Sequence, residues 1–247
     1  MHLVTSTTLS VVVLATALTL APTVPSAAAT ARPDPVGAVT PTPHPAVRAV
    51  PRPVAPAPSR VYVFGDSLTV GTIVYGSPSY LSAAMHAVHL TLAVRPSAKV
   101  GRRVGDGLAL LPSVPSGRRT VLIALGTNDV HASAAASATW IRRSRELLGP
   151  DVEIFWVNLR LTGTRFRNQT EVNAGLVDGF RADDARQAAA GHVGRSHVLD
   201  WSSFARDHHV SNRPDGIHYS LPDYRTRAVF YAESLAADPS YLRYRIG

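Results

Sequence analysis

Four short polar blocks hold the residues of this 247-residue chain that could carry out a reaction. Three of them follow predicted apolar strands, and the fourth precedes the last predicted helix. In chain order they are Gly65–Leu68 (GDSL), Val100–Arg102 (VGR), Gly126–Asp129 (GTND) and Asp215–Ser220 (DGIHYS). Open α/β sheets gather such loops at the carboxyl ends of their strands. We therefore expect the four blocks to meet at one edge of a sheet.

Ser67, His218 and Asp215 have the chemistry of a nucleophile, its base and the acid that orients the base. A serine hydroxyl is a weak nucleophile and needs an adjacent base, and an imidazole can take its proton near neutral pH. Asp215 precedes His218 by three residues, so its carboxylate can reach the imidazole within one turn. The alternative is that Ser67 only caps a helix after the first strand, because serine is a frequent N-cap residue.

The elements that must position these blocks alternate along the chain from Arg60. The predicted strands are Val61–Phe64, Thr91–Val94, Thr120–Leu125, Val152–Val157 and His197–Leu199. The predicted helices are Ser79–His89, Val104–Leu111, Ala134–Leu148, Glu171–Ala190 and Leu221–Ala236, the last preceded by a capping-box serine at Ser220 with Asp223. Alternation with unbroken apolar strands predicts the α/β class, a three-layer α/β/α sandwich around a central, roughly five-stranded parallel sheet.

In this order the four blocks resemble the SGNH (GDSL) hydrolase family, from roughly residue 60 to the C-terminus. The resemblance implies a flavodoxin-like SGNH fold with signature residues Ser67, Gly101, Asn128 and His218. It also implies an oxyanion hole made by the backbone N–H groups of Ser67 and Gly101 and by the side-chain amide of Asn128. An esterase of this kind needs no cofactor or metal. Gly105 and Gly107 are close rivals of Gly101 because they lie in the same stretch.

The C-terminal half also resembles SGNH domains attached to membrane acyltransferases of cell-wall and polysaccharide O-acetylation, since Asp200-Trp201 lies upstream of the Asp215–Ser220 block. Asp200 is at the same time the rival of Asp215 for the role of orienting acid. The larger α/β-hydrolase fold is not expected, because Thr69 stands where a Gly-x-Ser-x-Gly motif needs its second glycine.

Two further carboxylates lie within these blocks. Asp66 is expected to fix its loop through hydrogen bonds, and Asp129 is expected to cap the helix that follows it. The other interpretation of the Gly126–Asp129 block is a turn with capping residues and no chemical role.

The composition narrows the classes of partner. The chain has a formal net charge of +8, and residues 60–247 alone keep +6, with Lys99 as the single lysine. There is no run of basic residues interleaved with aromatics, so no nucleic-acid partner is expected. A basic surface favours anionic surroundings such as a cell wall. The chain has no cysteine, which leaves no disulfide, thiolate metal site or cysteine nucleophile, and its histidines show no strong metal-binding spacing.

The sequence of the N-terminal quarter of the chain predicts that the protein is exported. Residues 1–31 are predicted to be a secretory signal, with the apolar core Leu9–Ala21 and small-x-small cleavage patterns that end at Ala29 and Ala31. An uncleaved anchor is the alternative, because no Lys or Arg precedes the core, but the apolar run is short for a membrane span. Residues 32–59 contain nine prolines and are predicted to form an extended linker to the domain at residues 60–247. We therefore expect a secreted or wall-associated protein with no stable membrane span after cleavage.

The leading hypothesis is a secreted serine esterase that removes small acyl groups, acetyl first, from a small acyl ester or an acylated glycan. An O-acyltransferase that forms the same acyl-enzyme is the close rival, and a lipase or phospholipase is a third alternative, weakened by the lack of a long apolar lid segment. A metal-dependent hydrolase with ligands from Asp66, Asn128, Asp129 and Asp215, and a non-catalytic wall-binding module, are the alternatives from other classes. The natural substrate, the acyl length and the oligomeric state stay open at the level of sequence.

Overall fold

The structure, a computed structural model, describes residues 60–117, 119–192 and 194–237. The predicted signal at residues 1–31 and the predicted linker at residues 32–59 lie outside the described residues. No helix of the described part of the chain has the length and apolar character needed to cross a membrane.

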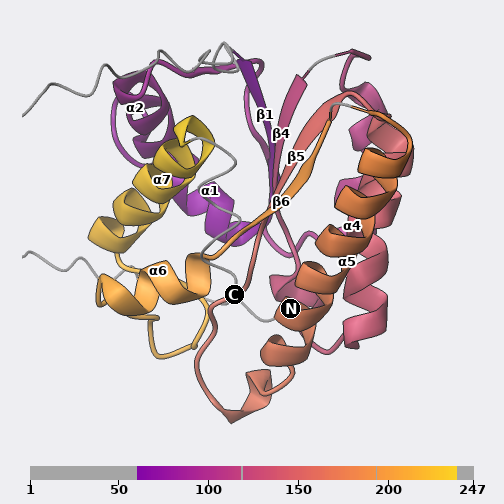
Figure 1. Cartoon of the computed structure of the whole chain (residues 1–247). Coiled ribbons are helices and arrows are strands. Elements are labelled where there is room, and N and C mark those ends of the chain that lie inside the picture. Colours follow the sequence, from indigo (N-terminus) through magenta and orange to yellow (C-terminus); the bar gives the residue numbers. More distant parts are fainter. Residues whose placement is uncertain (1–59, 118, 193, 238–247) are drawn as a thin grey trace, which may run out of the picture. The chain divides into compact units, whose positions relative to one another are not determined.

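A parallel sheet forms the centre of the domain (Figure 1). Its strands are β1 (Arg60–Gly65), β2 (Thr91–Leu92), β3 (Ser97–Ala98), β4 (Arg119–Ala124), β5 (Val152–Val157) and β6 (Ser196–Leu199). The order is β2-β1-β4-β5-β6, with β3 paired to the end of β1, and all the pairings are parallel. The predicted fold class is therefore confirmed, and all strands present their carboxyl ends at the same edge.

Helices cover both faces of the sheet, as Figure 1 shows. One face carries α1 (Ser67–Val74), α2 (Tyr80–Ala87), α6 (Trp201–Asp207) and α7 (Leu221–Ala236). The other carries α3 (Val104–Leu108), α4 (Ala134–Leu148) and α5 (Gln169–Ala189). Short 3₁₀ turns occur at η1 (Leu111–Ser113), η2 (Thr127–Asp129) and η3 (Thr164–Phe166).

Successive strand residues supply the two cores because side chains alternate across a strand. Phe155 and Val157 of β5 pack under α7, whereas Ile154 and Trp156 pack under α4 and α5. A strand buried on both faces must be apolar at every position, which is why β5 reads as an almost unbroken apolar run in the sequence.

Most predicted elements are found with nearly the predicted bounds, whereas the helix predicted over Val104–Leu111 and the strand predicted over Thr91–Val94 are shorter than expected. Val152–Val157, Ala134–Leu148 and Leu221–Ala236 have the predicted bounds, and Ser220 caps α7 by accepting a hydrogen bond from the amide of Asp223 at 3.3 Å. The helix expected over Val104–Leu111 ends at Leu108 and continues as the separate turn η1. Glycine weakens a helix and proline cannot continue one, and this segment contains Gly105, Gly107 and Pro112.

The expected set of helices and strands lacks α1, β3 and α6, although the alternative interpretation of Ser67 did expect a helix after the first strand. β3 has only two residues, and α6 has seven, so neither is long enough for a periodic pattern. The strand expected over Thr91–Val94 is likewise reduced to Thr91–Leu92, because the chain leaves β1 before it returns as β3.

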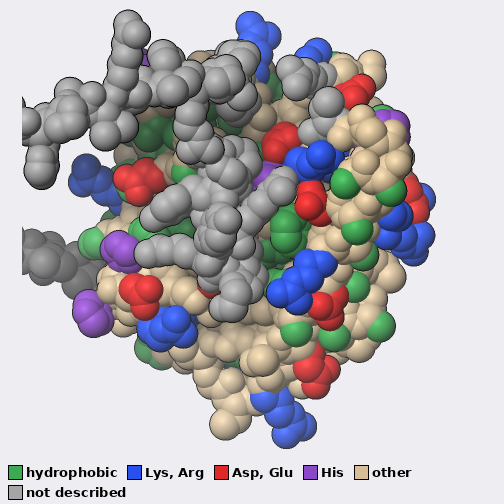
Figure 2. Space-filling view, in the orientation of Figure 1, with side chains coloured by type: hydrophobic (Ala, Val, Ile, Leu, Met, Phe, Trp, Pro, Cys, Tyr) green, Lys and Arg blue, Asp and Glu red, His purple; other side chains and the backbone are tan. Residues whose placement is uncertain are grey.

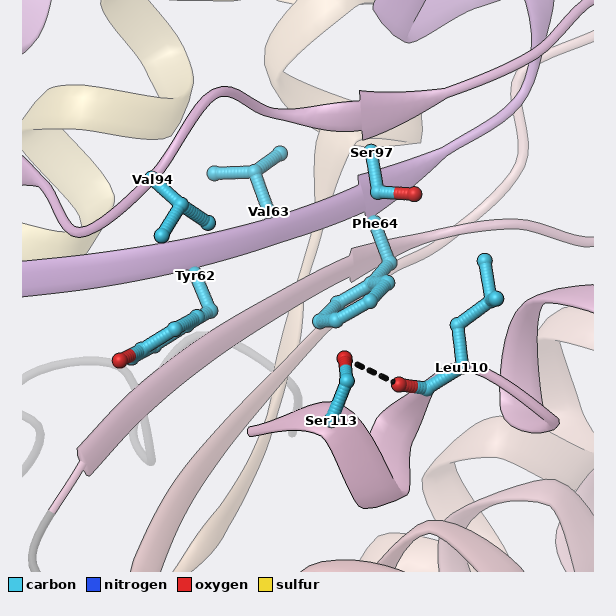
Figure 3. A pocket seen from close by; sticks show the side chains of 7 residues that line it. All are labelled: Tyr62, Val63, Phe64, Val94, Ser97, Leu110 and Ser113. Carbon is cyan, nitrogen blue, oxygen red and sulfur yellow. Dashed lines mark hydrogen bonds between the residues drawn. The ribbon is translucent and has the colours of Figure 1, made fainter. Parts of the chain in front are cut away.

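A cavity of about 220 Å³ lies where the chain between β2 and β3 leaves β1. Figure 3 shows its lining, with Tyr62 and Phe64 of β1 on the same side as the segment after α3. The lining residues are Tyr62, Val63, Phe64, Val94, Ser97, Leu110 and Ser113. Most of the lining side chains are apolar, and the hydroxyl of Ser113 already donates to the carbonyl of Leu110. The interior of this cavity is therefore mainly apolar.

Charged side chains on the face shown in Figure 2 lie at separate places, with Lys and Arg interspersed among Asp and Glu. That face has no continuous basic stripe.

The close packing of α4 on α5 gives a prediction about stability. A Cβ added at Gly175 of α5 would lie 2.1 Å from the backbone oxygen of Ala134 and 2.1 Å from Oγ of Ser137. Because a backbone atom cannot move aside as a flexible side chain can, Gly175→Ala should lower the free energy of unfolding by about 1–3 kcal/mol. Urea unfolding with an unchanged m-value would measure this loss.

Gly105→Ala is the matched control, since an added Cβ at this exposed position of α3 meets nothing within 4 Å. Alanine favours a helix over glycine by about 1 kcal/mol, so this variant should be as stable as the wild type or slightly more so. Equal stability of Gly175→Ala and the wild type would show that α4 and α5 are not in close backbone contact.

Candidate active site

Ser67 is the first residue of α1, directly past the end of β1. The N-cap of this helix is Asp66, whose carboxylate accepts a hydrogen bond from the amide of Leu68 at 2.9 Å. The alternative interpretation, in which Ser67 is only the helix cap, is therefore wrong, and the expectation that Asp66 fixes its loop is confirmed. The hydroxyl of Ser67 remains available for another partner.

That partner is His218, which lies 151 positions further along the chain. Nε2 of the imidazole is 3.1 Å from Oγ of Ser67, and Nδ1 is 2.8 Å from Oδ2 of Asp215. The three side chains thus form one row, in which the imidazole joins a hydroxyl to a carboxylate. Such a row can move a proton from the hydroxyl to the ring while the carboxylate holds the ring.

The carboxylate of Asp215 is held by more than the imidazole. Its Oδ1 accepts hydrogen bonds from the amides of Ile217 at 2.8 Å and His218 at 2.9 Å. Burial raises the pKa of Asp215, but the hydrogen bonds from the His218 ring and from these two amides lower it by more, to about 2. Asp215 is therefore an anion throughout the range in which histidines titrate, as an orienting acid must be.

Gly216 lets the loop of Asp215 and His218 approach the segment after β5. Its backbone has φ +73°, and an added Cβ would lie 2.1 Å from the carbonyl oxygen of Thr162. The amide of Thr162 donates to the carbonyl of Gly216 at 2.9 Å. The side chain of Arg165 donates in addition to the carbonyl of Asp215. A glycine between the acid and the base is thus required by a close backbone contact.

The segment after β5 is in turn held by two amide side chains of α5, a feature that the sequence did not reveal. Asn173 accepts from the amide of Leu159 at 2.8 Å and donates to its carbonyl at 2.9 Å. Gln169 makes the same pair of bonds with Leu161, at 2.7 Å and 2.8 Å. Residues four apart on one face of a helix are separated by about the same distance as residues two apart on an extended chain. This spacing is the signal by which the pair could have been found.

Tyr219 completes the support of the catalytic loop. Its hydroxyl donates to the carbonyl of Arg160 at 3.0 Å and accepts from Nε1 of Trp201 at 2.9 Å. The residue next to His218 is therefore anchored both to the segment after β5 and to the start of α6.

Gly101 and Asn128, the other two signature positions, lie next to each other at the same edge of the sheet. The Asn128 amide donates to the carbonyl of Arg102 at 3.0 Å, and an amide nitrogen has a second N–H to offer. Gly101 is exposed and has φ +73°, whereas its rivals Gly105 and Gly107 lie within α3. The positive φ distinguishes Gly101 as the residue whose backbone conformation calls for glycine.

Arg102 ties this loop to the end of β1. Its Nη1 atom donates to the carbonyl of Gly65 at 3.2 Å and also to the carbonyl of Ser97. The amide of Lys99 donates to the same Gly65 carbonyl at 3.2 Å. The two bonds to the Gly65 carbonyl lie two residues before Ser67. They join the loop that contains Gly101 to the turn that carries Ser67.

Asp129 does not cap the helix that follows it, contrary to the expectation from the sequence. Its carboxylate accepts from the amide of Val104 at 2.8 Å, which is the first residue of α3, and the N-cap of α4 is Ser133. Capping across a gap of 25 residues cannot be deduced from local spacing. Burial raises the pKa of Asp129, while the Val104 amide lowers it.

Asp200, the other candidate for the orienting acid, caps a helix instead. Its Oδ1 accepts from the amide of Ser203 at 3.0 Å, as the N-cap of α6, and from the side chain of Asn158 at 2.8 Å. The carboxylate that the structure sets against His218 is that of Asp215.

The alternative of a metal-dependent hydrolase requires ligands from Asp66, Asn128, Asp129 and Asp215. Asp66, Asp129 and Asp215 each accept hydrogen bonds from different backbone amides. In the described part of the chain no group of three or more His, Cys, Asp or Glu side chains is placed to hold a metal ion.

No family model and no curated protein matches the chain. Solved structures do match its fold. A member of the lipolytic protein G-D-S-L family from Veillonella parvula has a TM-score of 0.50 at 14% identity, covering 71% of this chain and 96% of that one. A carbohydrate esterase family 3 structure from Talaromyces cellulolyticus has a TM-score of 0.51 at 17% identity, with coverage of 71% and 95%. An acetyl esterase mutant with acetate ion has a TM-score of 0.51 at 16% identity, with coverage of 71% and 95%.

At these low identities the likeness establishes the fold, and the fold that the SGNH/GDSL resemblance implies is confirmed. The sequence blocks and the backbone thus agree on the same α/β/α arrangement.

The contact between His218 and Asp215 gives a prediction about the pKa of Asp215. Because the His218 ring is among the groups that lower the pKa of Asp215, His218→Ala should raise that pKa from about 2 toward the ordinary 3.8. A carboxyl with a depressed pKa stabilises the fold above its ordinary pKa. That contribution is lost as the pH falls from about 4 to 2. Carboxyl ¹³C NMR of Asp215 during an acid titration measures the shift.

Asn128→Ala is the control for this titration, since Asn128 makes no hydrogen bond to Asp215 among the described contacts. An unchanged Asp215 pKa in His218→Ala would show that the two side chains are not paired in solution.

Proposed function

We propose that the chain is a secreted serine esterase of the SGNH type that hydrolyses small acyl esters through an acyl-enzyme. The observation that carries the proposal is the row of Ser67, His218 and Asp215, with separations of 3.1 Å and 2.8 Å. A hydroxyl, an imidazole and a carboxylate in this order are what an activated serine nucleophile needs.

In the proposed reaction, Oγ of Ser67 attacks the ester carbonyl and His218 takes its proton. The tetrahedral intermediate then expels the alcohol, which receives that proton from the imidazolium. Water attacks the acyl-enzyme with His218 again as the base, and the acid leaves as Ser67 regains its proton. Asp215 holds Nδ1–H, so that Nε2 faces the hydroxyl.

The negative charge of each intermediate would be stabilised by three donors. Backbone N–H groups at the first turn of a helix have no partner within the helix, and that of Ser67 is the first of α1. The backbone N–H of Gly101 and the second N–H of the Asn128 amide complete the proposed oxyanion hole.

The proposed substrate is an acetylated carbohydrate. A carbohydrate esterase and an acetyl esterase share the fold, which supports this choice without deciding it. At the carboxyl edge of the sheet, the loops at residues 99–103, 126–133, 158–168 and 208–220 contain two carboxylates, Asp129 and Asp215, and the ends of β1 and β6 add Asp66 and Asp200. The same loops contain seven cationic side chains: Lys99, Arg102, Arg103, Arg160, Arg165, Arg167 and Arg213. This excess of positive charge favours a glycan that carries negative charge, as in an anionic cell wall.

The signal and linker predicted from the sequence support a location outside the cell for the proposed enzyme, where such glycans are found. The alternatives from the sequence are an O-acyltransferase, in which a sugar hydroxyl replaces water, and a lipase or phospholipase. No structural feature described above favours either, so the esterase remains the proposal, with neither cofactor nor metal in its mechanism.

The test is turnover of a panel of acetylated glycans and of nitrophenyl esters of increasing chain length by the purified protein. Acetyl esters should be the fastest. Ser67→Ala should abolish turnover, and His218→Ala should be nearly as damaging, because nucleophile and base act as a unit. Asn128→Ala should lose about 100- to 1000-fold, since two backbone donors remain. Asp215→Asn should also slow turnover strongly by favouring the wrong tautomer of the imidazole.

Asp200→Asn is the matched control, because asparagine can cap α6 almost as well as aspartate. It should keep nearly full turnover. Loss of turnover in Asp200→Asn with full turnover in Asp215→Asn would contradict the assignment of the acid. Transfer of acetyl to a sugar acceptor faster than to water would identify the acyltransferase alternative, and a preference for long chains would identify a lipase.

A further inference from the structure

The arginines of the domain differ in their partners according to where they lie. Those on α4 and α5 form ion pairs with nearby carboxylates: Arg142, Arg143, Arg145, Arg181 and Arg186. Those in the loops at the carboxyl edge of the sheet take part in none of the ion pairs found within the described residues: Arg102, Arg103, Arg160, Arg165, Arg167 and Arg213. A set of positive charges without ion pairs therefore lies in the loops around the proposed triad.

Two of these loop arginines are tied through their main chain to residues of the catalytic loop. The backbone carbonyl of Arg160 accepts a hydrogen bond from the hydroxyl of Tyr219 at 3.0 Å. The backbone amide of Arg213 donates to the carbonyl of His218 at 2.7 Å. Both cations are thus carried by segments that are fixed next to the imidazole.

Arg165 is the loop arginine whose side chain contacts a member of the triad. It lies in η3 and is exposed, and its Nη2 atom donates to the backbone carbonyl of Asp215. Its guanidinium carbon also lies 4.5 Å from the ring centre of Phe166, which is buried. Because a guanidinium stacks well on an aromatic ring, the ring and the carbonyl together limit where this cation can lie.

The guanidinium of Arg165 keeps most of its donors for another partner. A guanidinium has five N–H donors, and the carbonyl of Asp215 takes one of them. The carboxylate of Asp215 is already engaged by the His218 ring and by the amides of Ile217 and His218. Within the described residues the Arg165 side chain makes no other hydrogen bond and no ion pair. An oxyanion that reaches this place would meet a positioned donor with a full positive charge.

This guanidinium and the proposed nucleophile are close enough to contact one substrate. From Asp215 the path continues to Nδ1 of His218 at 2.8 Å, and from Nε2 to Oγ of Ser67 at 3.1 Å. One residue and one imidazole ring therefore separate the guanidinium of Arg165 from the serine. The side chains of Asp215 and His218 are 43% and 36% exposed, so this path is open to solvent. A sugar that places an ester carbonyl at Ser67 can place a second group at Arg165.

We propose that Arg165 binds an anionic group of the substrate, a carboxylate or a phosphate on the acetylated sugar, and thereby selects acidic acetylated glycans over neutral ones. The inference rests on the proposed esterase function. Arginine suits this role because its planar group offers paired N–H donors to either oxyanion. Arg160 and Arg213 add positive charge from the neighbouring segments, which raises the local concentration of an anionic substrate.

The test compares matched pairs of substrates on the purified protein. One pair is an acetylated methyl glucuronoside and its carboxyl methyl ester, which lacks the negative charge. The other is an acetylated methyl glucoside with and without a phosphate on its primary hydroxyl. The wild type should have a kcat/KM about 10-fold higher for the charged member of at least one pair, since a hydrogen bond to a charged group has an effect of this order. The pair that shows the preference identifies the group as carboxylate or phosphate.

Arg165→Gln should remove most of this preference, whereas Arg165→Lys keeps the charge and should retain part of it. The readout is the ratio of the two kcat/KM values within a pair, because any disturbance of the Asp215 loop slows both members alike. An absent preference in the wild type, or an unchanged preference in Arg165→Gln, would overturn the proposal.

Arg181→Gln is the matched control, because it removes the same charge at a distant place. Arg181 is also exposed, at 64%, but at a rise of about 1.5 Å per residue it lies about 18 Å along α5 from Gln169. This variant should leave the ratio unchanged. A fall in the ratio as large as that in Arg165→Gln would show that net charge alone sets the preference, and would overturn the assignment to Arg165.

Failure of the proposed function has a different signature. If the wild type turns over neither the charged nor the neutral esters, or if Ser67→Ala does so equally well, the esterase proposal fails. The inference is then decided by binding of the two charged sugars without their acetyl groups, titrated by NMR against the wild type and Arg165→Gln. Weaker binding to Arg165→Gln supports the site, and equal binding overturns it independently of activity.

Discussion

The hydrogen bond between Ser67 and His218 joins residues 151 positions apart, so it depends on the fixed relation of two helices. Ser67 begins α1, and His218 lies three residues before α7. The parallel sheet sets where α1 begins, because β1 ends at Gly65. The contact of Gly71 with Tyr224 sets how closely the two helices pack. A side chain at position 71 would overlap the ring of Tyr224, so the ring or α7 would have to shift.

The remaining supports all act on the loops that meet at this edge. Amide side chains of α5 fix the segment after β5, and that segment holds the loop of Asp215 and His218 through Gly216 and Tyr219. On the other side, Arg102 and Asp129 join the Gly101 loop to β1 and to η2. Loops positioned by hydrogen bonds to rigid elements keep the geometry that catalysis requires, although the loops themselves have little regular structure.

Much of this arrangement could be predicted from the sequence, because some of its signals are local. The almost unbroken apolar run of β5 and the periodic pattern of α4 fix their own bounds, and a serine after β1 indicates a site at the carboxyl edge. The contact of Asp129 with α3 connects distant parts of the chain, so no local pattern contains it. For Asn173 and Gln169, the spacing of four residues on α5 is a weak local signal of their contacts with the segment after β5. Two-residue strands such as β3 have no pattern to detect.

The central claim is that Ser67 is a nucleophile activated by His218. The most direct measurement is mass spectrometry of the protein after treatment with a serine-reactive alkyl phosphonate, followed by peptide mapping. The account predicts one adduct per chain, located on Ser67, absent from Ser67→Ala and formed far more slowly in His218→Ala. An adduct on another serine, or formation on Ser67 at the same rate with and without the histidine, would contradict it.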